Sequence, residues 1–255
     1  MKVNKFMRKH VVSVGEKDHI THARQIMRDH NYQILPVVNA DDCLKGIITD
    51  KDVMRVTSTR SNVTIDGFVS DVPLITAEDD IRSVLRSMSE LRLRYLPVVD
   101  RHACPVVTGI IGLTHIFTAL NEKIPEKKIS DIMKTDVETC ERSDALNKVW
   151  SNLLNSGLSG MPVMDKKEPV GMITIHDIIK SGYTRLDREA RRGRAPARVE
   201  KIMNTPLYTI TKDETVKACI EQLLRLNVGR LCVIEGGTLV GMVDLYDAAQ
   251  IMIGT

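Results

Sequence analysis

The sequence predicts an α/β (α+β) fold of four β-α-β-β-α units that pack as two pairs. Two observations carry this prediction: a repeated hydrophobic pattern and a repeated short phrase. The hydrophobic pattern occurs four times in the 255-residue chain, beginning at Ile20, Ile81, Leu146 and Val216. In the first three copies a proline stands 16 residues after the first apolar residue, and Cys232 takes that place in the fourth. Repeats of fixed internal spacing indicate one structural unit that recurs along the chain.

Each element of the unit follows from the local sequence, as the first copy shows. A β-prone stretch at residues 11–14 (VVSV) opens it. Apolar residues at helical spacing then predict an amphipathic helix that begins at Ile20. The apolar run at 35–38 (LPVV) predicts a strand, and the run at 44–48 (LKGII) predicts a second strand after a turn. A last helix follows that strand directly.

A unit of about 60 residues is too small to bury its sheet alone. We therefore expect two units to pack sheet to sheet and to share a core, so that four units form two pairs. The predicted units are 1–60, 61–122, 123–185 and 199–255, and an Arg-rich link at 186–198 precedes the last.

Composition excludes several classes of protein. Apolar residues make up 43% of the chain and charged residues 27%, which is ordinary for a globular protein, and a net charge of +3 is too weak to indicate DNA or a membrane surface. No apolar window is long enough to span a bilayer. Five scattered cysteines without a CxxC pair favour reduced thiols, and hence a cytoplasmic location, over disulfides or a zinc site. We find no nucleophile–base pair, P-loop or metal cluster, so we expect neither an enzyme nor a bound metal.

The repeated phrase is GIITDKDV, from Gly46, and GMITIHDI, from Gly171. Its Thr is expected where a strand ends and a helix begins, and its Asp one turn later. Such a carboxylate can accept hydrogen bonds from the two hydroxyls of a ribose, while the helix start favours phosphate. The same spacing also fits a capping box, in which the two side chains only satisfy free backbone N–H groups.

The other two copies of the phrase depart from this pattern. In the second, Gly112 replaces Thr and His115 replaces Asp, so we expect its site to be empty or altered. In the fourth, Asp244 replaces Thr while Asp247 remains, and two carboxylates would repel a phosphate. That site would prefer a neutral part of a ligand, a metal-bridged phosphate, or nothing.

The β-α-β-β-α unit, the LPVV strand and the G-h-h-T-x-x-D phrase resemble the CBS domain, two of which form a Bateman module. The resemblance covers about Lys2 to Ile253 and extends to the gamma regulatory subunit of AMP-activated kinase and to stand-alone archaeal or bacterial CBS proteins. It implies two Bateman modules that close into a flat disk, either within one chain or through a homodimer.

The resemblance also implies that residues of the partner unit line one side of each cleft. It places Arg94 beside the cleft of Asp52, and Thr205 and Val228 beside that of Asp177. Arg230 stands where the kinase subunit carries phosphate-binding arginines, although the other copies lack an arginine there. His176 is placed to reach a phosphate, and an exposed helix side chain is the alternative. The candidate nucleotide-binding residues are Thr49, Asp52, Arg94, Thr174, His176, Asp177, Thr205, Val228, Arg230 and Asp247.

These observations predict a non-catalytic regulatory protein that binds AMP, ADP or ATP, with or without magnesium, and signals occupancy to a protein effector. S-adenosylmethionine is an alternative ligand, but its sulfonium cation would gain nothing from Arg230. A nucleic-acid-associated or scaffold protein that uses the Arg-rich link is the other alternative. It is the weaker one because the link lacks interleaved aromatic residues. No membrane partner is expected.

Overall fold

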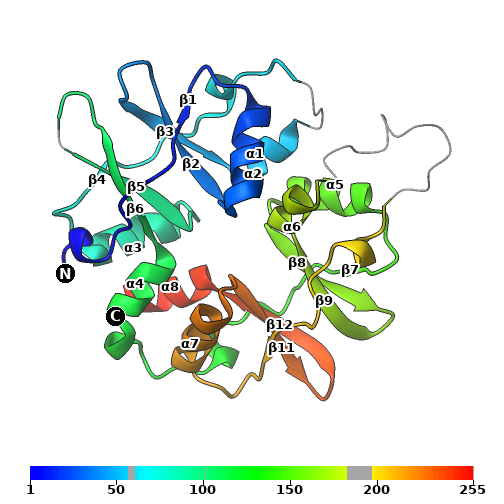
Figure 1. Cartoon of the computed structure of the whole chain (residues 1–255). Coiled ribbons are helices and arrows are strands. Elements are labelled where there is room, and N and C mark those ends of the chain that lie inside the picture. Colours follow the sequence, from blue (N-terminus) through cyan, green and yellow to red (C-terminus); the bar gives the residue numbers. More distant parts are fainter. Residues whose placement is uncertain (57–60, 101, 183–196, 255) are drawn as a thin grey trace.

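The computed structural model describes residues 1–56, 61–100, 102–182 and 197–254. Four copies of one unit lie around a common centre, so a single chain supplies all of them (Figure 1). Residues 186–196 of the predicted Arg-rich link lie outside the described residues.

Each unit contains the predicted elements in the predicted order. Unit 1 comprises β1 (Val14–Gly15), α1 (Ile20–His30), β2 (Ile34–Val38), β3 (Leu44–Thr49) and α2 (Asp50–Arg55). Unit 2 comprises β4 (Ile75–Thr76), α3 (Ile81–Glu90), β5 (Tyr95–Val99), β6 (Val107–Gly112) and α4 (Leu113–Ala119). Unit 3 comprises β7 (Cys140–Glu141), α5 (Leu146–Ser156), β8 (Gly160–Asp165), β9 (Glu168–Thr174) and α6 (Ile175–Ser181). Unit 4 comprises β10 (Thr209–Ile210), α7 (Val216–Leu226), β11 (Arg230–Glu235), β12 (Thr238–Asp244) and α8 (Leu245–Ile253).

The middle strand of each sheet pairs in parallel with the first strand and antiparallel with the third. The first strand has only two residues, fewer than the four-residue stretch suggests. In unit 1 it pairs with Val37 and Val38 and does not reach Pro36. A middle strand can therefore contain a proline, because no ladder hydrogen bond is required of Pro36 on that side.

Units 1 and 2 meet edge to edge through short backbone bridges, as do units 3 and 4. Ile47 pairs with Ser70, and Met172 with Asn204. The glycine before each paired strand residue makes this approach possible. A Cβ on Gly46 would overlap the Ser70 carbonyl oxygen, and Gly46 has a φ of 153°, which side chains disfavour. The glycine of the phrase thus admits the partner unit's backbone.

The buried core does not follow the expected pairs. One apolar cluster joins units 1 and 3 and includes Trp150, and a second joins units 2 and 4 and includes Phe117. Helices carry this packing: α1 and α2 lie against α6, and α3 lies against α8. The expectation that the sheets of a pair share one core was therefore wrong. Within a pair the opening segments enter the partner's cluster, through Val3, Ile65, Ile129 and Val199, whereas the apolar faces of the helices join the two pairs to each other.

A short 3₁₀ helix precedes each unit and packs on the partner unit. The helices are η1 (Val3–Lys5), η2 (Ile65–Phe68), η4 (Ile129–Asp131) and η5 (Val199–Lys201), and η3 (Asn121–Lys123) follows α4. The Val3 N–H donates to the Asp79 carbonyl of unit 2, and the Ile65 N–H to the Asp18 carbonyl of unit 1. This exchange of opening segments ties the two units of each pair together.

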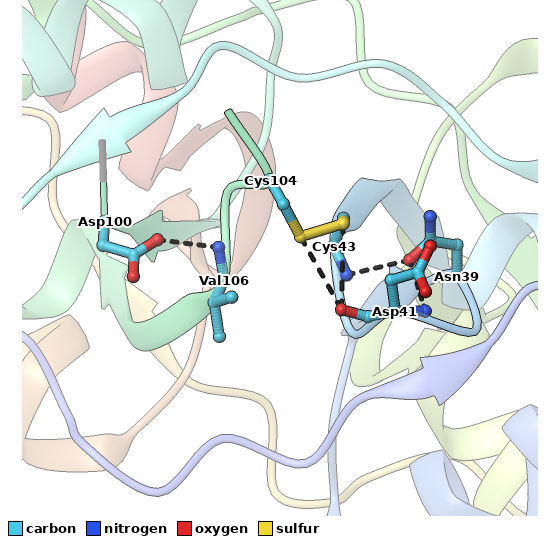
Figure 2. The surroundings of a disulfide bond; sticks show 6 residues. All are labelled: Asn39, Asp41, Cys43, Asp100, Cys104 and Val106. Atoms are coloured by element: carbon cyan, nitrogen blue, oxygen red, sulfur yellow. Dashed lines mark hydrogen bonds between the residues drawn. A yellow bond between two sulfur atoms is a disulfide. The ribbon is translucent and has the colours of Figure 1, made fainter. Parts of the chain in front are cut away.

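Two of the five cysteines form a disulfide, which corrects the prediction that all are reduced thiols. Cys43 and Cys104 are joined with a Cα–Cα distance of 5.0 Å (Figure 2). Nothing in the local sequence indicates this pair, because the two cysteines are 61 residues apart and meet only once units 1 and 2 pair. Cys140, Cys219 and Cys232 are free and buried, and burial raises the pKa of each to about 12.

Candidate functional site

We call the place where the third strand of a unit turns into its last helix the cap junction of that unit. In unit 1 the Thr49 N–H and hydroxyl donate to Asp52 Oδ2 over 2.9 and 2.6 Å, and the Asp52 N–H donates to Thr49 Oγ1 over 3.4 Å. Unit 3 repeats this arrangement between Thr174 and Asp177, with distances of 2.9, 2.6 and 3.2 Å. The capping-box interpretation is confirmed at both junctions.

Capping uses only one oxygen of each carboxylate. Within the described part of the chain, the hydrogen bonds to Asp52 and Asp177 all end on Oδ2, and none reaches Oδ1. Both side chains are half-buried. A carboxylate oxygen in this state can accept hydrogen bonds from vicinal hydroxyls. The capping and ribose-binding interpretations are therefore compatible, since each uses a different oxygen.

The cap junction of unit 4 contains a cation, the Lys134 ammonium of unit 3. The Asp244 N–H donates to Asp247 Oδ2 over 2.8 Å, and the Asp247 N–H to Asp244 Oδ1 over 3.0 Å. The other oxygen of Asp247 lies 2.7 Å from Lys134 Nζ. Burial and the charge of Asp244 raise the pKa of Asp247 to about 6. Burial also acts to raise the pKa of Asp244, but the charges of Lys134 and Arg230 and its hydrogen bonds hold it below the usual value.

The cap junction of unit 2 lacks a carboxylate. Gly112 is the N-cap residue, and its N–H donates to His115 Nδ1 over 3.1 Å. Burial, with the positive charge of Arg8, lowers the pKa of His115. His115 therefore performs only the capping half of the role that Asp52 has in unit 1.

One position of the partner unit separates the two kinds of junction. The residue that pairs with the strand position after each glycine is Ser70 at unit 1 and Asn204 at unit 3, but Arg8 at unit 2 and Lys134 at unit 4. The Thr-x-x-Asp junctions thus face a small neutral residue, and the altered junctions face a cation. Sequence reasoning missed this position, although its regular place a few residues before each first strand could have revealed it.

The remaining predicted residues lie in different surroundings. Thr205 lies beside unit 3, because a Cβ on Gly171 would sit 3.2 Å from its methyl group. Val228 is partly buried against the core of units 2 and 4. His176 reaches across to unit 1, with Nε2 2.6 Å from Asn31 Oδ1, and burial lowers its pKa.

Arg230 binds the neighbouring unit directly. Its Nη1 donates to the Gly160 carbonyl over 2.7 Å, and its Nη2 donates to the Ser159 hydroxyl. Both acceptors belong to unit 3, so two of its donors connect units 4 and 3. Burial lowers the pKa of Arg230, and the opposing charge of Asp244 limits this effect.

Further charged groups gather near Arg230. Lys51 Nζ donates to the Gly157 carbonyl of unit 3 over 2.5 Å. Burial raises the pKa of Asp50 to about 6, against the lowering effect of Lys51 and Arg230. Arg92 lies 4.9 Å over the ring of Tyr246. Units 1, 2 and 4 therefore all direct cations toward this region.

Arg94 adds an unsatisfied donor to the same region. Its Nε is buried and has no hydrogen-bond partner among the described residues. Its guanidinium lies 6.0 Å from the centroid of the Tyr95 ring and close to Gly229 of unit 4. A buried donor without a partner is rare in a folded protein and is readily satisfied by a bound anion.

A cavity of about 560 Å³ lies elsewhere, lined by residues of α1 and of the segment just before it, from Lys17 to Arg28. None of the predicted site residues lines it. The described residues contain no group of three potential metal ligands. Among the helices described here, none is long and apolar enough to cross a bilayer.

Comparison with known proteins identifies the family of the chain. The model of the CBS domain matches residues 3–58, 68–122, 129–183 and 199–254. The chain therefore belongs to the CBS-domain family, with four copies of the domain.

Two archaeal proteins are similar over much of the chain. The protein MJ1225 of Methanocaldococcus jannaschii is 28% identical over 195 residues, which are 70% of this chain and 69% of that protein. Its crystal structure, proposed to be that of an archaeal homologue of g-AMPK, has a TM-score of 0.85 at 22% identity and covers 98% of this chain and 99% of that one.

An uncharacterized conserved protein from Pyrococcus horikoshii gives a TM-score of 0.67 at 22% identity, covering 99% of this chain and 100% of that one. The chain spans only 60% of a longer relative, MJ1404 of Methanocaldococcus jannaschii, at 25% identity. At these identities the structural likeness shows the fold.

Proposed function

We propose that the protein is a non-catalytic regulatory sensor that binds adenine nucleotides at the cap junctions of units 1 and 3. The proposal rests on the hydrogen bonds of the Asp52 and Asp177 carboxylates. Each gives one carboxylate oxygen to its cap and keeps the other oxygen available. A ribose diol supplies the two hydroxyl donors that such an oxygen accepts.

The surrounding charge favours an anionic ligand over S-adenosylmethionine. Lys51, Arg94 and Arg230 all lie where the units converge, and Arg94 Nε lacks a partner among the described residues. A guanidinium with an unsatisfied N–H gains a charge-assisted hydrogen bond from phosphate and is repelled by a sulfonium. AMP, ADP and ATP are therefore the ligands that we propose, with S-adenosylmethionine as the alternative.

Signalling follows from the position of the two junctions. The core joins unit 1 to unit 3 through α1, α2 and α6, and the last two of these helices begin at the two junctions. A ligand that prefers one packing of these helices shifts the protein toward it by its difference in affinity. The effector that reads this change, a homodimer and a cytoplasmic location remain predictions.

The test is calorimetric titration of AMP, ATP and S-adenosylmethionine into the wild type, Asp52→Asn and Asp177→Asn. Asparagine keeps one oxygen that can accept the cap N–H. It replaces the second carboxylate oxygen, which is the one available to a ribose, with an NH2 donor, and it removes the negative charge. We expect two AMP sites in the wild type and one in each variant. Asp247→Asn is the matched control, with two sites, because Lys134 already occupies that carboxylate.

Thermal unfolding provides a second measurement, because ligand at 100 times its Kd adds about 2.7 kcal/mol of stability. If none of these ligands binds to folded wild-type protein, the two junctions are helix caps only and the proposal fails. If the protein binds S-adenosylmethionine but not the nucleotides, it is still a sensor with two sites, and S-adenosylmethionine takes the place of AMP, ADP or ATP as its ligand.

A further inference from the structure

The disulfide joins the loop between β2 and β3 of unit 1 to the loop between β5 and β6 of unit 2. Cys43 and Cys104 each stand seven residues after the proline of their unit, Pro36 and Pro97. Cys43 lies in the turn before β3, and Cys104 in the loop before β6 (Figure 2). Backbone contacts surround the bond, since Cys43 pairs with Val106. The Leu44 N–H also donates to the Pro105 carbonyl over 2.7 Å. The cross-link therefore fastens two hairpins that already touch.

This cross-link is confined to one pair of units. Counted from Pro162 and Cys232, the same position holds Pro169 in unit 3 and Leu239 in unit 4. The second pair therefore cannot form it, although its cap junction in unit 3 has the same geometry as that in unit 1. The protein thus contains one junction next to a disulfide and a matched junction without one.

The two bonded cysteines are also the accessible ones. Both are partly exposed, whereas Cys140, Cys219 and Cys232 are buried. Their sulfur atoms lie 3.8 and 3.6 Å from the Asp41 carbonyl oxygen, which can accept a hydrogen bond from a thiol once the disulfide is reduced. A reductant can therefore reach the pair without disturbing the core.

One strand connects the disulfide to the cap junction of unit 1. β3 begins at Leu44, next to Cys43, and ends at Thr49, the N-cap residue that holds Asp52. Along its length Ile47 pairs with Ser70 of unit 2, so unit 2 borders both the disulfide and the junction. A cross-link at one end of β3 limits how far the two units can separate at the other end.

We propose that the Cys43–Cys104 disulfide is a reversible redox clamp that holds units 1 and 2 together and tightens nucleotide binding at Asp52, but not at Asp177. The effect on affinity rests on the proposed function; the clamp itself does not. A clamp that fixes the binding conformation in advance reduces the cost of ordering it on binding.

Reduction requires a dithiol. One thiolate of the dithiol attacks a sulfur of the disulfide, breaks the S–S bond and forms a mixed disulfide, and the other cysteine leaves as a thiolate that takes up a proton. The second dithiol sulfur then closes the reductant's own disulfide and releases the remaining cysteine. Two electrons and two protons pass to Cys43 and Cys104.

The first experiment counts thiols by alkylation of denatured protein and mass spectrometry. Without reductant we expect three reactive thiols, and with dithiothreitol five. Hydrogen exchange of the Leu44 amide should accelerate on reduction, because its hydrogen bond crosses between the hairpins. Neither measurement involves nucleotide. Five reactive thiols in unreduced protein, or unchanged exchange at Leu44, would overturn the clamp.

The second experiment titrates AMP into oxidised and reduced Asp177→Asn, which retains the unit 1 junction, and into Asp52→Asn, which retains that of unit 3. We expect reduction to weaken binding about fivefold or more in the first variant and to leave the second unchanged. Cys43→Ser combined with Cys104→Ser should behave as permanently reduced protein. Equal affinities in both redox states, or an equal change at both junctions, would refute the coupling. If AMP binds to neither junction, the proposed function and the coupling fail together, and the thiol count and hydrogen exchange decide the clamp.

Discussion

Lys134 Nζ lies 2.7 Å from Asp247 Oδ1 and 3.6 Å from Asp244 Oδ2, so unit 3 inserts its own ammonium into the cap junction of unit 4. The corresponding oxygens of Asp52 and Asp177 have no such partner among the described residues. The partner unit therefore determines whether a junction is internally neutralised or available to a ligand. The four copies of the phrase are unequal for this reason as much as for their own sequence.

We expect Lys134→Asn to destabilise the fold. It takes Lys134 away from two nearly buried carboxylates and leaves Asp244 with Arg92, 3.5 Å away, but Lys134 is 44% exposed, so solvent screens part of the loss. We expect the free energy of unfolding in urea at pH 7 to fall by about 1–2 kcal/mol. Lys128→Asn is the matched control, because its partner Asp213 is well exposed, and it should change stability by less than about 0.5 kcal/mol. Equal effects of the two substitutions would contradict the internal neutralisation.

Asp50 should make stability depend on pH. Burial raises its pKa to about 6, so the folded state binds a proton more readily than the unfolded state does. Protonation therefore stabilises the fold, and this contribution is lost as the pH rises through 6. The stability of the wild type relative to Asp50→Asn should fall by about 1–3 kcal/mol between pH 4 and pH 7. Urea unfolding at several pH values measures this difference, and a constant or rising difference would be inconsistent with a raised pKa of Asp50.

The repeat made most of the fold predictable from sequence. Its period placed the four helices that begin at Ile20, Ile81, Leu146 and Val216, and the structure confirms all four starts. The two Thr-x-x-Asp phrases were located as well, because strand end, cap and carboxylate are consecutive in the chain. Local spacing is sufficient for features of this kind.

Features that join distant segments could not be predicted in this way. Lys134 and Asp247 are more than a hundred residues apart, and nothing near either residue indicates the other. The same holds for Cys43 and Cys104, which meet only after units 1 and 2 pair. Which units share a core depends on the outer faces of helices, and amphipathic spacing shows only that an apolar face exists.

Gly46→Ala tests whether the strand glycine admits the partner unit. A Cβ there would overlap the Ser70 carbonyl and approach Val69 Cγ1 to 2.7 Å, at a φ of 153°. Overlap and backbone strain together should cost about 2–4 kcal/mol of unfolding free energy. Gly67→Ala is the control, because a Cβ on Gly67 would meet no atom within 4 Å. The unfolding free energy of this variant should differ from that of the wild type by less than about 0.5 kcal/mol. Urea unfolding of both variants decides the point, and a neutral Gly46→Ala would show that the units do not approach this closely.

Arg230→Lys separates the structural role of Arg230 from phosphate binding. The guanidinium donates to both Gly160 and Ser159, and a lysine cannot reproduce two donors in a planar fork. We expect a loss of about 1–2 kcal/mol of stability. Ser159→Ala, which removes one acceptor and keeps the arginine, should show about half of that loss. If Arg230 also contacts phosphate, Arg230→Lys will weaken AMP but not adenosine in calorimetric titration, and Ser159→Ala will weaken neither. Equal weakening of AMP and adenosine by Arg230→Lys would assign Arg230 to the link between units 3 and 4 alone.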